Sequence, residues 1–341
     1  MSAALFALAV IFLASLSFGS VRIPIADVIA VLTGGEASRE VFEKIILGIR
    51  LPRAITGVFA GAALSLAGLQ MQTIFRNPLA DPFVLGVNSG ASLGVALVIL
   101  MIGPGSAALL AGLGGFGNAS VVVAASLGAG LVLALIMVLS LRVDLMTLLI
   151  MGLMVAYATS AVVSILMFFA MPERLQAFFA WTFGSFGTVT WSQMTVLAPA
   201  VVIGTLMSLV ATKSLNAFLL GEAYAVSLGV RILLWRTWVL IAASILTGAV
   251  TGFCGPIGFI GVAVPHLCRS LLQSSDHRVL FPFVIVMGAT IALFADFIAQ
   301  VPGSNVVLPL NAITALIGAP IVIWLLLRKR NLRQAFGEHA S

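Results

Sequence analysis

The chain has 341 residues, of which 61% are apolar and only 8% are Asp, Glu, Lys or Arg. Soluble domains carry about 25% charged residues, so these few charges cannot cover the surface of a water-soluble protein, and that class is excluded. The formal net charge is +6, but no run of basic and aromatic residues indicates nucleic-acid binding.

In lipid, backbone polar groups must be satisfied inside helices or a closed barrel. Barrel strands alternate polar and apolar residues over about ten positions, whereas this sequence has long unbroken apolar runs. We therefore predict an all-α polytopic membrane protein with about ten transmembrane helices. The expected spans are residues 3–19, 54–74, 84–102, 121–141, 146–169, 192–212, 237–253, 257–271, 281–299 and 311–327.

The first two spans are separated by a polar segment. Residues 3–19 have neither a basic segment before them nor an obvious cleavage site, so we expect a retained span rather than a signal peptide. Residues 21–53 contain five basic and four acidic side chains, too many for the hydrocarbon region. This segment is predicted to lie on the membrane surface. The span over residues 54–74 ends before the helix breaker Asn77-Pro78.

Glycine spacing indicates close helix packing in the first half of the chain. Gly57 and Gly61 lie four residues apart, as do Gly86, Gly90 and Gly94. Such faces let neighbouring backbones approach closely, so we assign these glycines to packing rather than to chemistry. A glycine-rich loop is expected at residues 103–118, and a short surface helix through residues 178–181.

The connection at residues 213–236 is the longest on its side of the membrane. Residues 215–229 are expected to form an amphipathic helix that displays Glu222 and stops at Gly229. Its apolar face is expected to comprise Phe218, Leu219, Ala225 and Leu228. Because a helix lying on lipid is usually basic and this one is acidic, a partner protein is the favoured contact.

Ten spans place both termini on the same side. If that side is the cytoplasm, 11 of the 17 basic residues lie inside, including the cluster Arg328-Lys329-Arg330. This excess obeys the positive-inside rule and predicts cytoplasmic termini.

Several kinds of chemistry have no motif in the sequence. A nucleotide-binding P-loop is absent, and no His or Cys cluster has metal-ligand spacing. An ion-coupled secondary transporter usually places an acid within a span, and no acid falls at the centre of a predicted span, although backbone carbonyls can also bind sodium. An intramembrane enzyme would need a pair such as Ser89 and His266, which no nucleophile-elbow motif supports. Both classes stay open as alternatives.

Short motifs rich in Gly, Pro, Arg and Asp occur from about residue 45 to 330. They include Arg50-Leu51-Pro52-Arg53, Arg76-Asn77-Pro78-Leu79-Ala80-Asp81-Pro82, Leu220-Gly221-Glu222, Gly258-Phe259-Ile260-Gly261, Pro265-His266, Asp276-His277-Arg278, Ala295-Asp296 and Gly318-Ala319-Pro320. In this order they resemble the permease subunits of type II ABC importers for cobalamin, haem and ferric siderophores, the FecCD-type permeases.

The resemblance implies a type II ABC importer permease fold, with residues 1–341 forming a single transmembrane permease domain. It implies a homodimer with a second permease copy, two separate ATP-binding subunits and a periplasmic or lipid-anchored substrate-binding protein in the bacterial plasma (inner) membrane. The chain is then no enzyme and binds no cofactor, because ATP and Mg²⁺ would bind the partner ATPase. The cargo would be an iron chelate, either a ferric siderophore or haem, or cobalamin.

The resemblance also implies roles for individual residues. Arg50 and Arg53 match arginines that dock acidic groups of the binding protein, whereas Gln300 stands at a third basic position. The alternative for both arginines is snorkelling at the interface. The ATPase-coupling residues would be Leu219, Gly221, Glu222, Leu228 and Gly229. The cytoplasmic gate would be formed by Asn77, Leu79, Leu145 and Met146, the last two in place of small hydroxyl residues.

Overall fold

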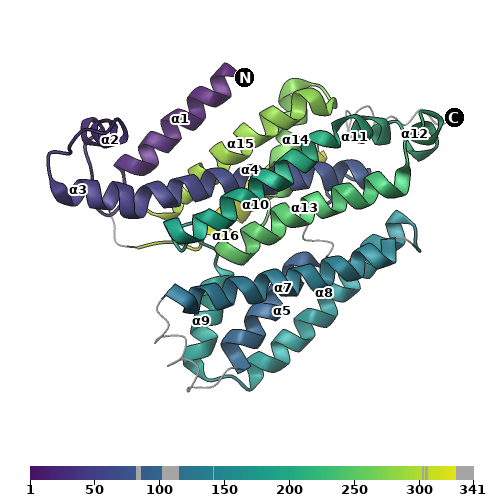
Figure 1. The fold of residues 1–341 in the computed structure, drawn as a ribbon, viewed down its shortest axis with the longest axis horizontal. Coiled ribbons are helices and arrows are strands. Elements are labelled where there is room, and N and C mark those ends of the chain that lie inside the picture. Colours follow the sequence, from purple (N-terminus) through teal and green to yellow (C-terminus); the bar gives the residue numbers. More distant parts are fainter. Residues whose placement is uncertain (82–85, 102–114, 141, 302, 304–305, 328–341) are drawn as a thin grey trace.

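The computed structural model describes residues 1–81, 86–101, 115–140, 142–301, 303 and 306–327, and helices make up most of these ranges (Figure 1). The basic cluster at residues 328–330 and most of the predicted loop 103–118 lie outside the described residues. The helices are α1 (Ser2–Ser17), α2 (Ile25–Leu32), α3 (Glu40–Ile45), η1 (Ile46–Arg50), α4 (Leu51–Ile74), α5 (Val87–Ala96), η3 (Leu97–Met101), α7 (Gly115–Ser140), α8 (Leu145–Phe168), α9 (Pro172–Thr182), α10 (Trp191–Val210), α11 (Thr212–Leu219), α12 (Glu222–Ser227), α13 (Ile232–Cys254), α14 (Ile260–Leu272), α15 (His277–Ala299) and α16 (Leu310–Leu327).

The predicted spans correspond to helices one for one. Among the described residues, six helices are long and apolar enough to cross a membrane, and four shorter apolar helices are α1, α5 with η3, α14 and α16. A helix, α9, is also present where the short helix was expected. Together these elements confirm the all-α polytopic prediction.

One boundary differs from the prediction. The surface segment does not end before the second span, because α3, η1 and α4 form one continuous helix of 35 residues, Glu40–Ile74. Pro52 has no backbone N–H to give to a helical bond. The π-helical turn η1 directly before it accommodates the missing donor.

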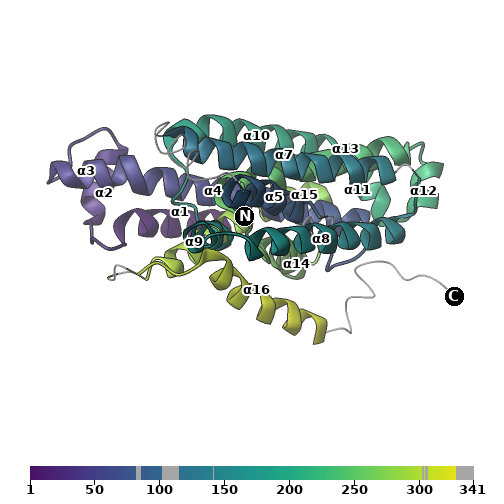
Figure 2. The ribbon, with the colours of Figure 1, turned by 90° about the horizontal axis from the view of Figure 1, so that it is seen from below.

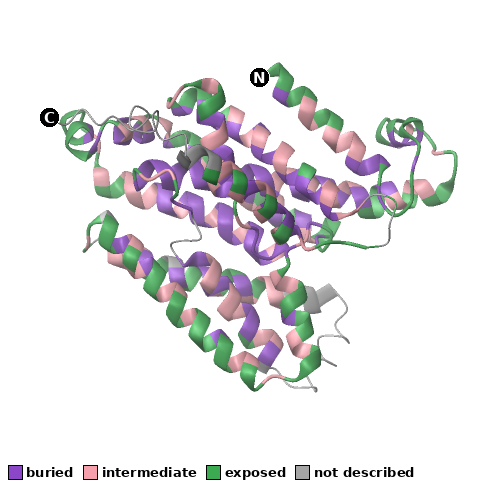
Figure 3. Ribbon diagram, turned by 180° about the vertical axis from the view of Figure 1, so that it is seen from behind, coloured by how far each residue is buried: buried purple, intermediate pink, exposed green. Residues whose placement is uncertain are grey.

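Two groups of helices are visible in Figure 1. Helices α5, α7, α8 and α9 form the lower group, and the upper group surrounds α4, which packs against α10, α13, α14 and α15. Buried residues are concentrated around α4, whereas α8 is largely exposed on its outward face (Figure 3). The view from below shows α16 at the side of the bundle (Figure 2), where it packs against α14 and α15.

Glycines lie where α4 crosses its neighbours and where α5 crosses α7. A methyl group on Gly61 would collide with the carbonyl of Gly288 on α15, and one on Gly68 with the carbonyl of Gly261 on α14. The same relation holds between Gly90 and Gly128. The packing role expected for Gly61 and Gly90 is confirmed, because at these crossings backbone lies directly against backbone.

The bundle has two ends, which we name the Arg53 end and the Glu222 end. At the Arg53 end, the ring of Phe18 after α1 packs edge-on against Phe297 of α15, with centroids 6.1 Å apart. The backbone N–H of Leu308 before α16 donates to the carbonyl of Ala299 at that same end, 2.7 Å away. Helix α1 therefore runs toward the Arg53 end and α16 runs away from it, as an even number of crossings requires.

We expect Gly68→Ala to destabilise the protein by roughly 1–3 kcal/mol, because the added methyl must displace the backbone of α14. The matched control is Gly130→Ala on α7, where an added methyl meets open space and alanine is the better helix former. Thermal unfolding in detergent measures both. Equal melting temperatures for the two variants would contradict the close crossing.

Candidate functional site

Arg50 is held inside the protein at the Arg53 end. Its side chain is buried, and its guanidinium donates to the carbonyl of Leu16, 2.7 Å away, and to that of Val21. These bonds join the start of α4 to the end of α1. Because carbonyl groups carry no net charge, these bonds use some of the N–H donors of Arg50 without neutralising its positive charge.

Arg53 forms an ion pair with Asp296 on α15. Its Nε lies 2.9 Å from Oδ2 and its Nη2 lies 2.8 Å from Oδ1, the paired geometry that suits a guanidinium and a carboxylate. The Asp296 side chain is 2% exposed and that of Arg53 is 16% exposed. Gln300 donates from Nε2 to Asp296 Oδ2, 2.9 Å away. The residue at the third basic position therefore orients the carboxylate in this chain.

Both arginines line one depression of about 340 Å³. Its wall also includes Ser20, which is exposed, and Gln300. The sequence-predicted docking residues are thus brought together. The depression therefore has two guanidinium groups in its lining.

The Glu222 end departs from the single helix expected over residues 215–229. Two helices, α11 and α12, meet at Gly221, whose φ of +105° lies outside the range of a right-handed helix. Glu222 is consequently the first residue of α12 rather than a mid-helix residue. The predicted stop at Gly229 is confirmed, because α12 ends at Ser227 and Gly229 has a φ of +79°.

The expected apolar face is split. Phe218 and Ala225 are buried against the bundle, Leu219 is half-buried, and Leu228 is 58% exposed. Other large apolar side chains are exposed beside it, namely Leu220, Tyr224 and Val226. Glu222 adds a carboxylate to this surface and pairs with Arg236 of α13, with 2.7 Å between Oε1 and Nη2.

The first half of the expected gate follows α4. Arg76, with a φ of +46°, ends the helix, and the N–H of Asn77 donates to the carbonyl of Gln72, 3.1 Å away. Asn77 Oδ1 accepts the N–H of Leu79 at 2.9 Å, and the Leu79 side chain is exposed. A Cβ on Gly221 would lie 3.8 Å from a guanidinium nitrogen of Arg76, so this segment borders α12.

The second half of the expected gate begins α8. Asp144 caps the helix by accepting the N–H of Met146 at 3.0 Å, and hydrogen bonds, chiefly from the Thr147 hydroxyl, hold the pKa of Asp144 below its usual value. Met146 is exposed, whereas the side chain of Leu145 lies outside the described residues. Helix α8 packs against α5, α7 and η3, so the two halves belong to different helix groups.

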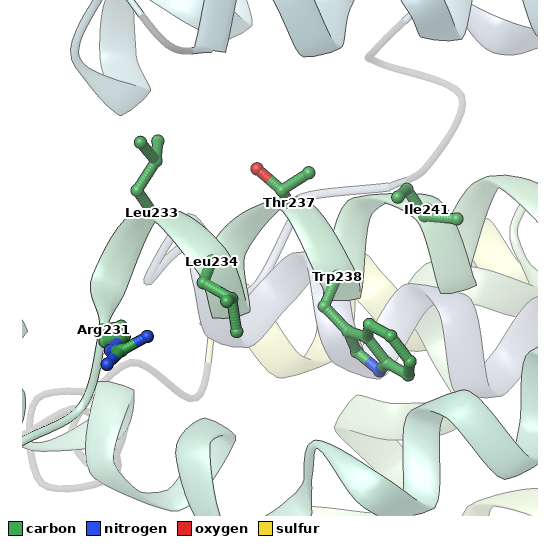
Figure 4. Close-up of a pocket in the computed structure, with 6 residues that line it drawn as sticks. All are labelled: Arg231, Leu233, Leu234, Thr237, Trp238 and Ile241. Carbon is green, nitrogen blue, oxygen red and sulfur yellow. The ribbon is translucent and has the colours of Figure 1, made fainter.

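A separate groove of about 520 Å³ runs along α13 (Figure 4). Leu233 and Thr237 project to one side of the helix, and Trp238 projects to the other (Figure 4). Arg231 is the single charged residue in its lining. The wall is mostly hydrocarbon, so the groove lacks the convergent polar groups of a specific polar-ligand site.

Residues 7–328 match the model of the FecCD transport family. The chain belongs to this family. It is 36% identical over 289 residues to the hemin transport system permease protein HmuU of Yersinia pestis, with 84% of each chain covered. It is 38% identical over 287 residues to the vitamin B12 import system permease protein BtuC of Klebsiella pneumoniae, with 83% of this chain and 82% of that protein covered.

The fold agrees with FecCD membership. A solved structure described as an inward-facing conformation of a metal-chelate type ABC transporter matches with a TM-score of 0.83 at 29% identity, covering 96% of this chain and 98% of that one. The protein is thus the permease of an ABC importer, a multi-pass membrane subunit that works with ATPase and binding-protein partners. Membership decides against the ion-coupled carrier and the intramembrane enzyme.

Sequence reasoning gave no role to a set of buried polar residues in this FecCD permease. Arg269 of α14 is buried and donates from Nη1 to Gln72 Oε1 of α4, 2.5 Å away. His277 at the start of α15 is fully buried. The signal was present for His277, which lies in the motif Asp276-His277-Arg278, but a motif does not say which partner a polar side chain meets.

We expect Asp296→Asn to destabilise the FecCD permease by roughly 1–3 kcal/mol, because it leaves the guanidinium of Arg53 without its carboxylate in a mostly buried setting. The control is Glu40→Gln, which breaks an ion pair between side chains that are 74% and 77% exposed and should leave the melting temperature unchanged. If both variants have the same melting temperature, the Arg53–Asp296 pair contributes no more to stability than an exposed ion pair.

Proposed function

We propose that this chain moves a bulky metal chelate into the cytoplasm, either an iron chelate (a ferric siderophore or haem) or cobalamin. The observation that carries the proposal is sequence identity of 36–38%, over more than four fifths of the chain, to permeases named for hemin and vitamin B12. The metal chelate is cargo and not a cofactor of the chain. ATP and Mg²⁺ would bind two partner ATPase subunits.

The proposed assembly is a homodimer of this permease, in which residues 1–341 act as one transmembrane domain. The Glu222 end faces the cytoplasm and the Arg53 end faces outward in the bacterial plasma membrane. Both termini are then cytoplasmic, which agrees with the positive-inside count. The largely exposed α8 has apolar surface available for lipid or for the second copy.

On the outward side, we assign docking of a periplasmic or lipid-anchored binding protein to the depression with Arg50 and Arg53. An acidic side chain from the binding protein would enter the depression and share the donors of both guanidinium groups. Because the arginines are already fixed by internal bonds, little conformational freedom is lost on docking. Interfacial snorkelling does not require this pre-formed geometry.

On the cytoplasmic side, we assign ATPase contact to α11 and α12. The exposed apolar side chains beside Glu222 suit a groove on another protein, and the ion pair with Arg236 connects α12 to α13. Leu219 and Leu228 supply apolar contact, and Gly221 and Gly229 set the ends of α12. A displacement of α12 by the ATPase would therefore reach the spans.

For the gate, we assign Asn77 and Leu79 of one copy to face Leu145 and Met146 of the second copy. This pairing brings together Leu79 and Met146, two exposed side chains from different helix groups of one chain. Alternating access would then depend on how the two copies move relative to each other.

We expect Ser20→Glu to weaken binding of the cognate binding protein by about tenfold, because a carboxylate in the depression competes for Arg50 and Arg53 without removing either arginine. The matched control is Ser20→Gln, which adds nearly the same volume without charge. Affinity is measured on nanodisc-embedded permease at two salt concentrations. Equal affinities for the two variants at low salt would contradict docking through this depression.

We expect Leu228→Asp to reduce co-purification of the ATPase subunits by about tenfold or more, because it places a charge in the proposed contact. Val41→Asp is the control, since Val41 is 62% exposed, similar to Leu228 at 58%, but lies in α3 at the opposite end. Both variants should melt like the parent protein. Full ATPase recovery with Leu228→Asp would overturn the contact.

A further inference from the structure

A chain of buried and partly buried hydrogen bonds connects three helices at the Glu222 end. Asn216 of α11 contacts His277 at the start of α15, with 2.7 Å between Asn216 Oδ1 and His277 Nδ1. The other ring nitrogen, His277 Nε2, lies 2.8 Å from the hydroxyl of Thr73 in α4. His277 and Thr73 are fully buried, and α11 packs against both α4 and α15.

The neighbours of Asn216 fix its orientation. Its Nδ2 donates to Asp276 Oδ1 at 2.6 Å, and its Oδ1 accepts the backbone N–H of His277 at 2.9 Å. The backbone N–H of Arg278, and next the amide of Asn216, hold the pKa of Asp276 below its usual value. Asp276 is therefore an acceptor, and the oxygen of Asn216 has to face His277.

This orientation assigns the histidine proton. Because Asn216 Oδ1 can only accept, Nδ1 of His277 carries a hydrogen and donates it. In the neutral imidazole, Nε2 is then an acceptor. The Thr73 hydroxyl has one hydrogen and two acceptors within reach, Nε2 at 2.8 Å and the Leu69 carbonyl at 2.9 Å, and the contact with Nε2 is the one that joins α4 to the ring. The ring therefore bridges α11 and α4 by direct contacts at both of its nitrogens.

The chain continues into the segment that carries Asn77. The carbonyl of Thr73 accepts the N–H of Arg76 at 3.2 Å, and the carbonyl of Gln72 accepts the N–H of Asn77 at 3.1 Å. These bonds close the last turn of α4. The position of Thr73 therefore determines where residues 76–79 begin.

We infer that His277 is a positioning residue that transmits a displacement of α11 to the inner end of α4 and to the segment Arg76–Leu79. The inference rests on the proposed function for its biological purpose, because the ATPase is what would displace α11. The mechanical link itself belongs to the permease alone. A rigid aromatic ring with a hydrogen bond at each nitrogen is suited to this task, because the distance between its two nitrogens is fixed.

Thr73 offers a matched pair of variants. Thr56 is also in α4, is also fully buried, and has its Oγ1 2.8 Å from the carbonyl four residues before it, as Thr73 has at 2.9 Å. Thr73 additionally contacts His277. Thr73→Val and Thr56→Val thus remove the same group from the same helix, but only the first breaks the chain. Thr73→Ser keeps the hydroxyl.

The test is hydrogen exchange of the full-length chain in lipid nanodiscs, read at the amides of residues 75–80. Asn216→Ala, at the far end of the chain of bonds, should speed this exchange about fivefold or more, as should Thr73→Val. Thr56→Val should leave the exchange rate of these amides unchanged, and Thr73→Ser should exchange at the rate of the parent protein. The double variant Asn216→Ala/Thr73→Val should exchange no faster than the faster single variant, because both break one path.

Two results would overturn the inference. One is faster exchange with Asn216→Ala that is confined to α11 and the first turn of α15, with residues 75–80 unchanged. The other is additive effects of the two substitutions. The measurement needs neither ATPase nor cargo, so a failure here is distinguishable from loss of the ATPase contact in the Leu228→Asp experiment.

Discussion

The carbonyl of Gly261 lies so close to Gly68 that no side chain fits at this crossing of α14 and α4. This constraint, repeated at Gly61 and Gly288, makes α4 the axis of the upper helix group. In hydrocarbon, helices gain little from burying apolar area and depend on packing and on satisfied polar groups. Backbone contact supplies the packing at these crossings. The polar links of α4 at Gln72 and Thr73 are possible because its neighbours lie this near.

The same axis connects the two ends of the molecule. At its start, Arg53 is paired with α15 through Asp296, and at its last turn Thr73 meets α15 again through His277. Helices α4 and α15 are therefore held at both ends by polar contacts and in the middle by glycines. A pair fixed at three levels resists separation along its whole length. The group of α5, α7, α8 and α9 joins the upper group chiefly through α13, which packs against α7 and α5.

The class of fold was readable from the sequence because hydropathy reports directly on the solvent around each helix. Element type, span number and the tight glycine faces followed from that. The continuous helix through Pro52 did not, since a π-helical turn leaves no hydropathy signature. The break at Gly221 was missed because an apolar period continues across it. For the site, Arg50 and Arg53 could be placed at one end, but the burial of Arg50 depends on carbonyls of α1 that are distant in sequence.

Helices α11 and α12 have eight and six residues, well below the length at which an isolated helix is stable in water. Their helical structure therefore depends on contacts with the bundle, which are made by Phe218, Ala225 and the hydrogen bonds of Asn216. An element of this kind opens at low energetic cost and is among the first to be cut by a protease. A partner bound over α11 and α12 would shield the cleavage site. The fraction of permease that a protease cuts at Gly221 would therefore report the fraction that has no ATPase bound.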